Sequence, residues 1–595
     1  MIFFYEIVSK LKSIIFLEKK LYVITFLFSL AGLNNYAFSQ NFAWAKQFGG
    51  ASSSALSLSI AVDANGNSYT TGAFGGVVDF DPGAGTYQLT AASTVGDIFV
   101  SKLDASGNFI WAKRIGNVNS SAQTYSVAVD ASGNVFISGT FYGTVDFDPG
   151  TGIYNLSAAG GYIFIARLDA SGNFVWAKQI GGGVDFDGAG WDLTVDANSN
   201  VYTTGNFRGS ADFDPGGGVY FLTSVDPNQQ DAFVSKLDVS GNFIWAKKLG
   251  GADREMGISI AVDVSGNVYT TGYILGVLVG DFDPGPGVYN LAPAGVSDIY
   301  ISKLDPSGNF VWAKLMGATG SDNGYSIAVD ANGNVYTAGT FNGTVDFDPG
   351  SGTFNLTSVT SNDFFISKLD ASGNFVWAKQ IGVPGDYVSI FIDANSYVYI
   401  ASDFFASGDF DPGPGTFILT SAGQVDVFLS KLDVSGNFVW AKQMGGSAHD
   451  WCHSGTVDAN GNVYLTGWFE GTGDFDPGPG VYNLTPTGNP DGFVVKLGAV
   501  TTGVADFNNF FHSINIFPNP VSTSATISFS LARSMQISFT IFDEQGKIVS
   551  TVAEKFYAKG DHKIVWNALW ENAGVYFLRM QSANAILTRK IIVVR

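Results

Sequence analysis

An all-β fold is predicted by three features of this sequence: its composition, a sevenfold repeat and the spacing of its turn residues. Of the 595 residues, 74 are glycine and 14% are aromatic, whereas only 14% are charged. This composition suits many short strands joined by tight turns better than long surface helices. The chain is too long for one simple core, so several domains or a repeat array are expected.

Residues 1–39 have the layout of a secretory signal peptide. Lys19 and Lys20 precede the apolar run LYVITFLFSLAGL, and the small residues Ala37 and Ser39 stand at the −3 and −1 positions of a cleavage site. The run is shorter than the roughly 20 residues that a membrane-spanning helix needs. We therefore expect a cleaved leader, and no transmembrane segment after its removal.

The tripeptide WAK recurs seven times at intervals of 63–69 residues. Within one repeat, 322–379, the segments SIAVDA, NVYTAGTF, FFISKLD and NFVWAK are rich in β-branched and aromatic residues, and ANGN or ASGN separates them in pairs. Asn-Gly and Ser-Gly supply the positive φ of hairpin turns, so these segments are predicted strands. Four strands per repeat is the content of a propeller blade. The sequence therefore predicts a β-propeller over 40–499.

The two ends of the repeat array predict that the propeller has seven blades and is closed by its N-terminal strand. The array opens with FAWAKQFGG alone and ends at DGFVVKLG, where the expected NFVWAK strand is missing. We expect 42–49 to pair beside 493–497 and so complete the last blade. Such pairing removes the free sheet edges at which chains aggregate.

Each repeat is longer than the 40 to 45 residues, roughly, that a four-stranded blade needs. The excess is the segment GTVDFDPGSGTFNLTS between the second and third strands. If SIAVDA is the innermost strand, this segment and the connection from the outermost to the next innermost strand emerge on one face, here called the variable face. Because binding residues gather on variable loops, we expect a binding site there.

The paired stretches AVDANGNVYTAG and LDASGNFVWAKQIGG resemble the bacterial β-propeller repeats of secreted proteins over most of 42–497. They are also similar to the tryptophan-docking repeat of quinoprotein propellers. The resemblance implies that the repeated tryptophans join adjacent blades and take no part in a reaction. These residues are Trp44, Trp111, Trp176, Trp245, Trp312, Trp377 and Trp440.

The motif DFDPG also occurs seven times and allows two interpretations. In an extended segment its two aspartates project to one face, which suits a calcium site, although calcium prefers six to eight oxygen ligands. Alternatively, the aspartates accept hydrogen bonds from the amides of a turn. The candidate calcium ligands are Asp79, Asp81, Asp146, Asp148, Asp212, Asp214, Asp281, Asp283, Asp346, Asp348, Asp409, Asp411, Asp474 and Asp476.

Charge and cysteine content exclude several classes of partner. Residues 40–499 carry 18 basic and 44 acidic residues, a net charge of −26, which disfavours nucleic acid and anionic membranes and attracts cations. The single cysteine, Cys452, excludes an internal disulfide and a cysteine-rich zinc site. Calcium is the cofactor that the acidic repeats suggest.

No catalytic residue is assigned, and a binding role is favoured over an enzymatic one. The chain contains no G-x-S-x-G elbow, phosphate-binding glycine loop or H-E-x-x-H motif. One local departure from the repeat is HDWCH at 449–453, where His449, Cys452 and His453 could ligate a metal or act as nucleophile and base. The alternative is drift in a solvent-facing loop before the last innermost strand.

The C-terminal region differs from the repeats. Residues 500–511 are expected to form a linker, and 512–595 alternate apolar and polar residues as in a small antiparallel β-sandwich. This region resembles the C-terminal sorting domain of the type IX secretion system of Bacteroidetes. The matching residues are Pro518, Asn519, Pro520, Gly546, Lys547, Gly574, Tyr576 and Lys590. The resemblance implies export by that machinery, with the protein released or held at the cell surface.

Three functions follow as hypotheses from this organisation. The first is a secreted or surface-displayed module that binds extracellular glycan or protein through the variable face. The second is an enzyme that degrades polysaccharide or peptide with residues on that face. The third is a structural surface component that associates with itself.

Overall fold

The computed structural model describes residues 40–93, 95–118, 121–182, 186–385, 387–488, 490–499, 511–531, 534–544, 547–582 and 585–595. All regular elements in these ranges are β-strands, which confirms the all-β prediction. None of the described residues forms a helix with the length and hydrophobicity needed to cross a membrane. The predicted signal peptide and nearly all of the predicted linker lie outside the described residues. The chain forms two compact units, 40–499 and the part that begins at 500.

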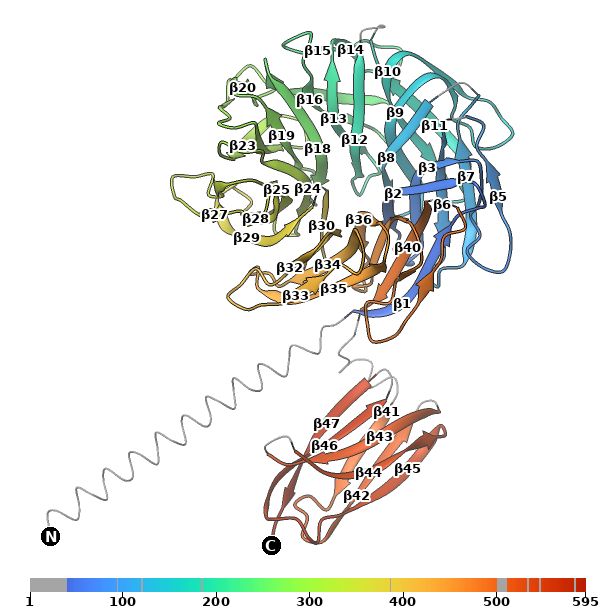
Figure 1. The fold of residues 1–595 in the computed structure, drawn as a ribbon, viewed down its shortest axis with the longest axis vertical. Coiled ribbons are helices and arrows are strands. Elements are labelled where there is room, and N and C mark those ends of the chain that lie inside the picture. The colour runs from blue at the N-terminus through green and yellow to red at the C-terminus, as the bar shows by residue number, and fades with distance from the viewer. Residues whose placement is uncertain are drawn as a thin grey trace, which may run out of the picture. The chain divides into compact units, whose positions relative to one another are not determined.

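Residues 40–499 form sets of four antiparallel strands, which Figure 1 shows side by side around a common centre. Within a set, successive strands are neighbours from the innermost to the outermost. The first six sets are β2 (Ser54–Val62), β3 (Ser68–Gly75), β6 (Asp97–Leu103) and β7 (Phe109–Ile115); β8 (Ser121–Val129), β9 (Val135–Asp146), β10 (Asn155–Leu168) and β11 (Phe174–Ile180); β12 (Asp187–Val195), β13 (Val201–Arg208), β16 (Asp231–Leu237) and β17 (Phe243–Gly251); β18 (Arg254–Val262), β19 (Val268–Leu275), β22 (Ser297–Leu304) and β23 (Phe310–Met316); β24 (Asn323–Val329), β25 (Val335–Phe341), β28 (Asp363–Leu369) and β29 (Phe375–Pro384); and β30 (Val388–Ile392), β31 (Val398–Phe404), β34 (Asp426–Leu432) and β35 (Phe438–Gly446).

The remaining set takes its outermost strand from the other end of the unit. Its strands β36 (Asp450–Val457), β37 (Val463–Phe469) and β40 (Asp491–Gly498) are followed in the sheet by β1 (Asn41–Phe48). β1 pairs antiparallel with β40, and the register places Ala45 opposite Val495 and Phe48 opposite Gly492. The segment expected beside 493–497 is thus the one that pairs there.

The DFDPG segments form short hairpins between the second and third strands. In six of them, two or three residues pair with a short return strand; they are β4 (Val77–Asp79) with β5 (Gln88–Thr90), β14 (Ser210–Asp212) with β15 (Phe221–Thr223), β20 (Gly280–Asp281) with β21 (Asn290–Leu291), β26 (Thr344–Asp346) with β27 (Asn355–Thr357), β32 (Ser407–Asp409) with β33 (Ile418–Thr420), and β38 (Gly473–Asp474) with β39 (Asn483–Leu484). In the second set, the long strands β9 and β10 include this hairpin. The exit of an outermost strand bonds to the next hairpin, as where Asp79 N–H donates to the Gly49 carbonyl at 2.8 Å.

The phenylalanine of DFDPG belongs to the hydrophobic core. Phe80 is fully buried, and its ring centroid lies 4.8 Å from that of Phe99 and 5.5 Å from those of Phe48 and Phe74. Phe48 comes from β1, in the neighbouring set, so the motif fills the space between two sets. The equivalent residues Phe147, Phe213, Phe282, Phe347, Phe410 and Phe475 are also fully buried.

A side chain links each innermost strand to the next one, and we call these contacts the inner-strand links. The Ile390 N–H donates to the Oγ of Ser326 at 3.0 Å, for example. An innermost strand is a sheet edge, and its outward N–H groups have no partner within the sheet. The same link joins Ser59 to Val127, Ser126 to Leu193, Asp192 to Ile260, Ser259 to Ile327, Ser389 to Gly455 and Ser454 to Ile60.

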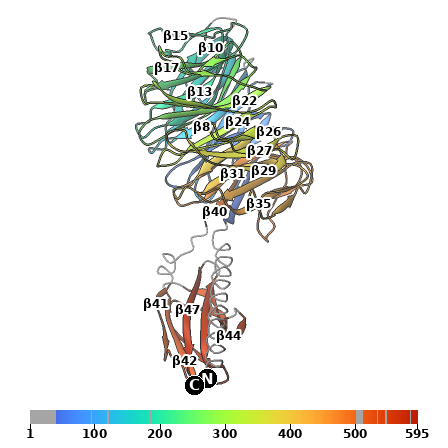
Figure 2. The ribbon, with the colours of Figure 1, turned by 90° about the vertical axis from the view of Figure 1, so that its left-hand side faces the viewer.

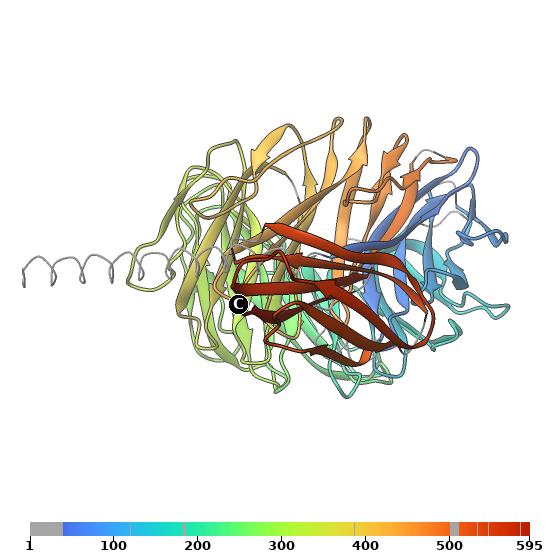
Figure 3. The ribbon, with the colours of Figure 1, turned by 90° about the horizontal axis from the view of Figure 1, so that it is seen from below.

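The second unit consists of two antiparallel sheets around one core, and Figures 2 and 3 show its strands in two further views. One sheet has the order β41 (Phe511–Phe517), β42 (Ser524–Leu531), β45 (Gly560–Asn567). The other has the order β44 (Ile548–Tyr557), β43 (Met535–Phe542), β46 (Gly574–Ser582), β47 (Ala585–Val593). Alternate residues of the strands, such as Ile527 and Phe529 on β42, enter the shared core.

The inner-strand links predict a cost for removing one serine oxygen. Ser326→Ala leaves the N–H of the buried Ile390 without this acceptor, and we expect a loss of about 1–3 kcal/mol in the free energy of unfolding. Urea unfolding of the purified protein measures this loss. Ser307→Ala, in an exposed turn, is the matched control and should be neutral. Equal free energies of unfolding for the two variants would contradict the proposed contribution of the inner-strand links to stability.

Candidate binding face

In all seven DFDPG motifs the aspartates accept hydrogen bonds from the backbone of their own hairpin. Oδ1 of Asp346 accepts from the N–H of Asp348 at 3.0 Å and of Phe354 at 2.8 Å, and Oδ1 of Asp348 accepts from Gly350 N–H at 2.8 Å. The other six copies repeat all three contacts. This geometry is the one that the turn interpretation requires. The calcium site stays a prediction.

Trp111 and five other repeated tryptophans donate from the indole N–H to a backbone carbonyl in the next set. Trp111 Nε1 donates to the Ala170 carbonyl at 3.2 Å, and the other distances lie between 3.1 and 3.3 Å. The acceptors all lie in the turn between the third and fourth strands. The further donors are Trp44, Trp176, Trp245, Trp312 and Trp377.

Six of the innermost strands contain a β-bulge. At each bulge, one residue has no partner on the neighbouring strand, which interrupts the alternation of side chains. The glycine opposite the bulge makes room for it: a Cβ on Gly339 would lie 1.9 Å from the Asn323 carbonyl oxygen. In the sixth set Ser402 replaces this glycine, and β30 pairs without a bulge. The bulged residues are Leu58, Tyr125, Trp191, Ile258, Tyr325 and His453. They are all partly exposed, and five residue types occupy the six positions, whereas the residue that follows is serine in all but one.

Two bulged aromatic residues stack between the second and third sets. The ring centroids of Tyr125 and Trp191 lie 4.4 Å apart. Tyr125 Oη donates to Gln123 Oε1 at 2.9 Å, and Trp191 Nε1 donates to Asn206 Oδ1. Burial raises the pKa of Tyr125 to about 12, so its hydroxyl stays protonated at neutral pH. The stack thus combines flat apolar rings with fixed hydrogen-bonding groups.

A second aromatic row crosses the fourth, fifth and sixth sets. The ring of Tyr325 lies 6.3 Å from that of Tyr273 and 5.2 Å from that of Tyr387, centroid to centroid. Tyr387 is 59% exposed, whereas the other two are partly buried. The sequence patterns did not reveal either aromatic group, because aromatic residues occupy these positions in only some of the repeats. For Tyr125, Trp191 and Tyr325, the available signal was an aromatic residue directly before the linking serine or aspartate.

The HDWCH segment does not form the reactive or metal-binding loop considered above. Trp451, Cys452 and His453 lie within strand β36, and Cys452 is buried with a thiol pKa raised by burial, which makes it a poor nucleophile. His453 Nε2 accepts from Trp468 Nε1 at 3.0 Å, and burial lowers the pKa of His453 to about 4. His449 stacks on Trp451 at 4.6 Å. Among the described residues, no group of three or more His, Cys, Asp or Glu side chains has an arrangement that could hold a metal ion.

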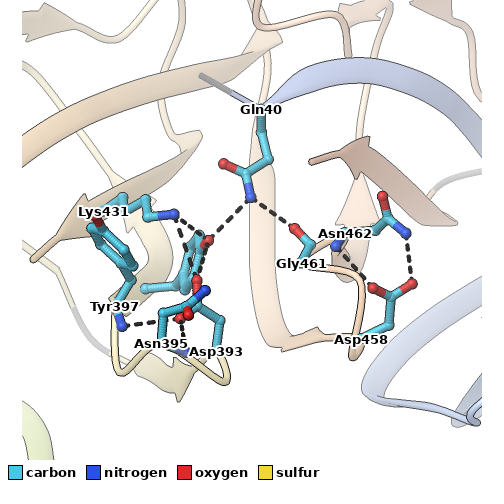
Figure 4. A network of polar contacts seen from close by, with 9 residues as sticks. Gln40, Asp393, Asn395, Tyr397, Lys431, Asp458, Gly461 and Asn462 are labelled. Carbon is cyan, nitrogen blue, oxygen red and sulfur yellow. Dashed lines mark hydrogen bonds and ion pairs between the residues drawn. The ribbon is translucent and has the colours of Figure 1, made fainter. Parts of the chain in front are cut away.

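A polar network joins the turns of the sixth and seventh sets on the face opposite the variable face (Figure 4). Gln40 Nε2 donates to Tyr399 Oη at 3.1 Å and to the Gly461 carbonyl at 2.9 Å. Lys431 Nζ donates to Tyr399 Oη at 2.6 Å and lies 3.6 Å from Asp393 Oδ2. Burial lowers the pKa of Lys431. The network fastens the residue before β1 to two neighbouring turns.

Pairs of buried carboxyl groups lie between some sets on the variable face. Asp426 Oδ2 accepts from Ala422 N–H and from Gln443 Nε2, both at 2.7 Å, and Asp450 Oδ2 accepts from Gly446 N–H at 2.7 Å. Both residues are fully buried. Burial raises the pKa of Asp426, and burial together with the neighbouring carboxylates raises that of Asp450 to about 7. Similar pairs are Asp231 with Glu255 and Asp298 with Asp322.

The carboxyl pair predicts a pH-dependent stability. The folded protein holds a proton on Asp450 up to about pH 7, whereas the unfolded chain releases it near the ordinary value of 3.8. This group therefore stabilises the fold less as the pH rises through that window. Urea unfolding at pH 5.5 and pH 8 should show a smaller pH dependence for Asp450→Asn than for the unchanged protein. The same pH dependence in both proteins would contradict the assignment.

In the second unit, the PNP motif holds the last strand. Asn519 Nδ2 donates to the Lys590 carbonyl at 2.9 Å, and Asn519 Oδ1 accepts from Ile592 N–H at 2.9 Å. The amide thus pairs with both kinds of backbone group along the edge of β47. Pro518 and Pro520 flank this asparagine.

The other predicted motif residues have different positions. Gly546 lies outside the described residues, and the Lys547 N–H donates to a turn carboxylate at 2.9 Å. Gly574 begins β46, and Tyr576 Oη donates to a backbone carbonyl of the preceding turn at 3.0 Å. Lys547, Gly574 and Tyr576 thus belong to the frame of the second unit.

Two family models match the chain. The model "Beta-propeller repeat" matches 43–73, 110–140, 244–278 and 311–345, and the model "Secretion system C-terminal sorting domain" matches 515–594. Among curated proteins, a WD repeat-containing protein of Acanthamoeba polyphaga mimivirus is 23% identical over 444 residues, which cover 60% of this chain and 31% of that protein. Regulatory protein FlaEY of Caulobacter vibrioides is 29% identical over 145 residues, 24% of this chain and 15% of that protein. The matches span less than a third of either relative.

Two solved structures of Porphyromonas gingivalis proteins are also similar to the chain. PorZ, a surface component of the type IX secretion system, is 12% identical with a TM-score of 0.22, over 94% of this chain and all of PorZ. Latent PorU is 13% identical with a TM-score of 0.13, over 61% of this chain and 31% of PorU. These TM-scores are too low to indicate a shared fold. The matched repeats and the matched tail make the chain a secreted or outer-surface β-propeller repeat protein with the type IX secretion C-terminal sorting domain of Bacteroidetes.

Proposed function

We propose that the protein is an exported seven-bladed β-propeller that binds an extracellular glycan or protein through its variable face. In this proposal, 1–39 is a cleaved signal peptide, 40–499 is the propeller, 500–511 is a linker and 512–595 is the sorting domain. The seven repeated tryptophans join adjacent blades, and β1 closes the ring.

Support for the closed ring comes from contacts around its centre. The innermost strands pack beside one another in the order β2, β8, β12, β18, β24, β30, β36, and β36 packs beside β2. The inner-strand link from Ser454 to Ile60 joins the last of these strands to the first. The pairing of β1 with β40 supplies the fourth strand of the set at this junction.

The observation that carries the binding proposal is the variation at the bulged positions. The links, the tryptophan bonds and the DFDPG hairpins repeat in nearly every set, whereas the bulged side chains differ and stay partly exposed. Several are Tyr or Trp, which give large contact areas with an apolar body and a polar handle. Such rings with nearby amide groups suit the apolar faces and hydroxyl groups of a sugar. We therefore propose a glycan as the ligand in preference to a protein.

Binding of the exported protein to a glycan array tests the proposal. Trp191→Ala should weaken binding to any captured glycan at least tenfold, because an aromatic hot spot contributes roughly 2 kcal/mol or more. Ile244→Ala, on the outermost strand β17 with 43% exposure, is the control away from the variable face and should bind normally.

The remaining outcomes separate the alternatives. Unchanged binding by Trp191→Ala would refute this site. Release of a shortened glycan or peptide would support an enzyme, and ordered assembly without ligand would support a structural component.

A further inference from the structure

The C-terminal residue holds a turn of the sorting domain in one conformation. The Arg595 guanidinium donates to the carbonyl oxygens of Ala568 at 3.2 Å, Leu569 at 2.7 Å and Glu571. It also donates to the Ser522 carbonyl at 3.4 Å. Arginine presents several N–H donors in a rigid plane, so one side chain can fix several carbonyl groups at once.

Further hydrogen bonds fix the same turn from within. The Ala568 N–H donates to the Thr523 carbonyl at 2.8 Å, and the Glu571 N–H donates to the Ala568 carbonyl at 3.1 Å. The Leu569 N–H donates to Asn567 Oδ1 at 3.0 Å. Ala568 itself is fully buried and anchors the turn in the core.

This rigid turn exposes a large apolar side chain. Trp570 is 87% exposed, although tryptophan side chains are on average highly buried. Leu569 beside it is 42% exposed, and Val594, next to the arginine that holds the turn, is 41% exposed. Trp566, four residues earlier, is 2% exposed and belongs to the core. Trp566 thus contributes to the core, whereas Trp570 is accessible to a partner.

We propose that Trp570 on this turn is the residue by which a protein component of the secretion machinery recognises the tail, through an apolar pocket that takes the indole. The match of 515–594 to a secretion sorting domain supplies the class of partner. Tryptophan is enriched among the residues that dominate protein interfaces. A turn whose backbone is already held in one conformation loses little backbone freedom on binding, which favours affinity. Arg595 acts as a positioning residue, since it holds the turn without being the main contact.

Export in the native host tests this role. Trp570→Ala should lower the amount of protein outside the cell at least tenfold and leave it folded in the periplasm, whereas Trp570→Phe should keep part of the export. Arg595→Ala should give an intermediate loss. Phe556→Ala is the control, because Phe556 is 68% exposed on strand β44 of the same unit, and it should be exported normally.

The design separates recognition from folding and from ligand binding. Thermal unfolding and limited proteolysis of the purified full chain check that each variant is folded, and Trp570→Phe serves if Trp570→Ala is not. Trp570→Ala purified from the periplasm should bind the same glycans of the array as the unchanged protein does. Normal export of folded Trp570→Ala, or an equal loss in Phe556→Ala, would overturn the proposal.

Discussion

Each innermost strand of the repeat region is a sheet edge, and the structure depends on how that edge is satisfied. A serine or aspartate oxygen accepts one N–H of the following innermost strand, so neighbouring sets meet through directional bonds and not through apolar contact alone. Six of these acceptors are serines, and the seventh is Asp192, which also accepts from the hydroxyls of Ser126 and Ser259. Removal from water raises the pKa of this carboxyl despite those donors.

The contacts that join neighbouring sets are made by other residues than the bulged ones proposed for binding. The indole bonds lie at the turns between third and fourth strands, and the buried phenylalanine of each DFDPG motif lies between the outer parts of two sets. The bulged side chains take part in neither contact. They can therefore vary without loss of the frame, which explains how one repeat carries leucine, tyrosine, tryptophan, isoleucine and histidine at the same position.

Sequence patterns predicted the parts of the fold that repeat with a conspicuous residue. The WAK tryptophans, the DFDPG turns and the ANGN turns marked the strands and the order of pairing, including the segment that pairs with β40. The inner-strand links were missed, because a serine four residues before a turn aspartate, as in Ser59 and Asp63, looks like any polar strand residue. The position of Cys452 within a strand was missed because the HDWCH segment departs from the apolar pattern of the other copies. The bulged aromatic groups need three-dimensional contacts between sets, which spacing alone does not give.

A disulfide between the ends of the first unit measures the closure of the ring most directly. Asn41 on β1 lies opposite Gly498 on β40, and antiparallel partners lie about 4.5–5.5 Å apart between Cα atoms, within reach of a disulfide. With Cys452→Ser, the pair Asn41→Cys and Gly498→Cys should form an intramolecular bond that mass spectrometry detects after proteolysis, whereas Asn41→Cys with Ser307→Cys should not. A folded protein in which the first pair stays reduced under oxidising conditions would contradict the closed ring.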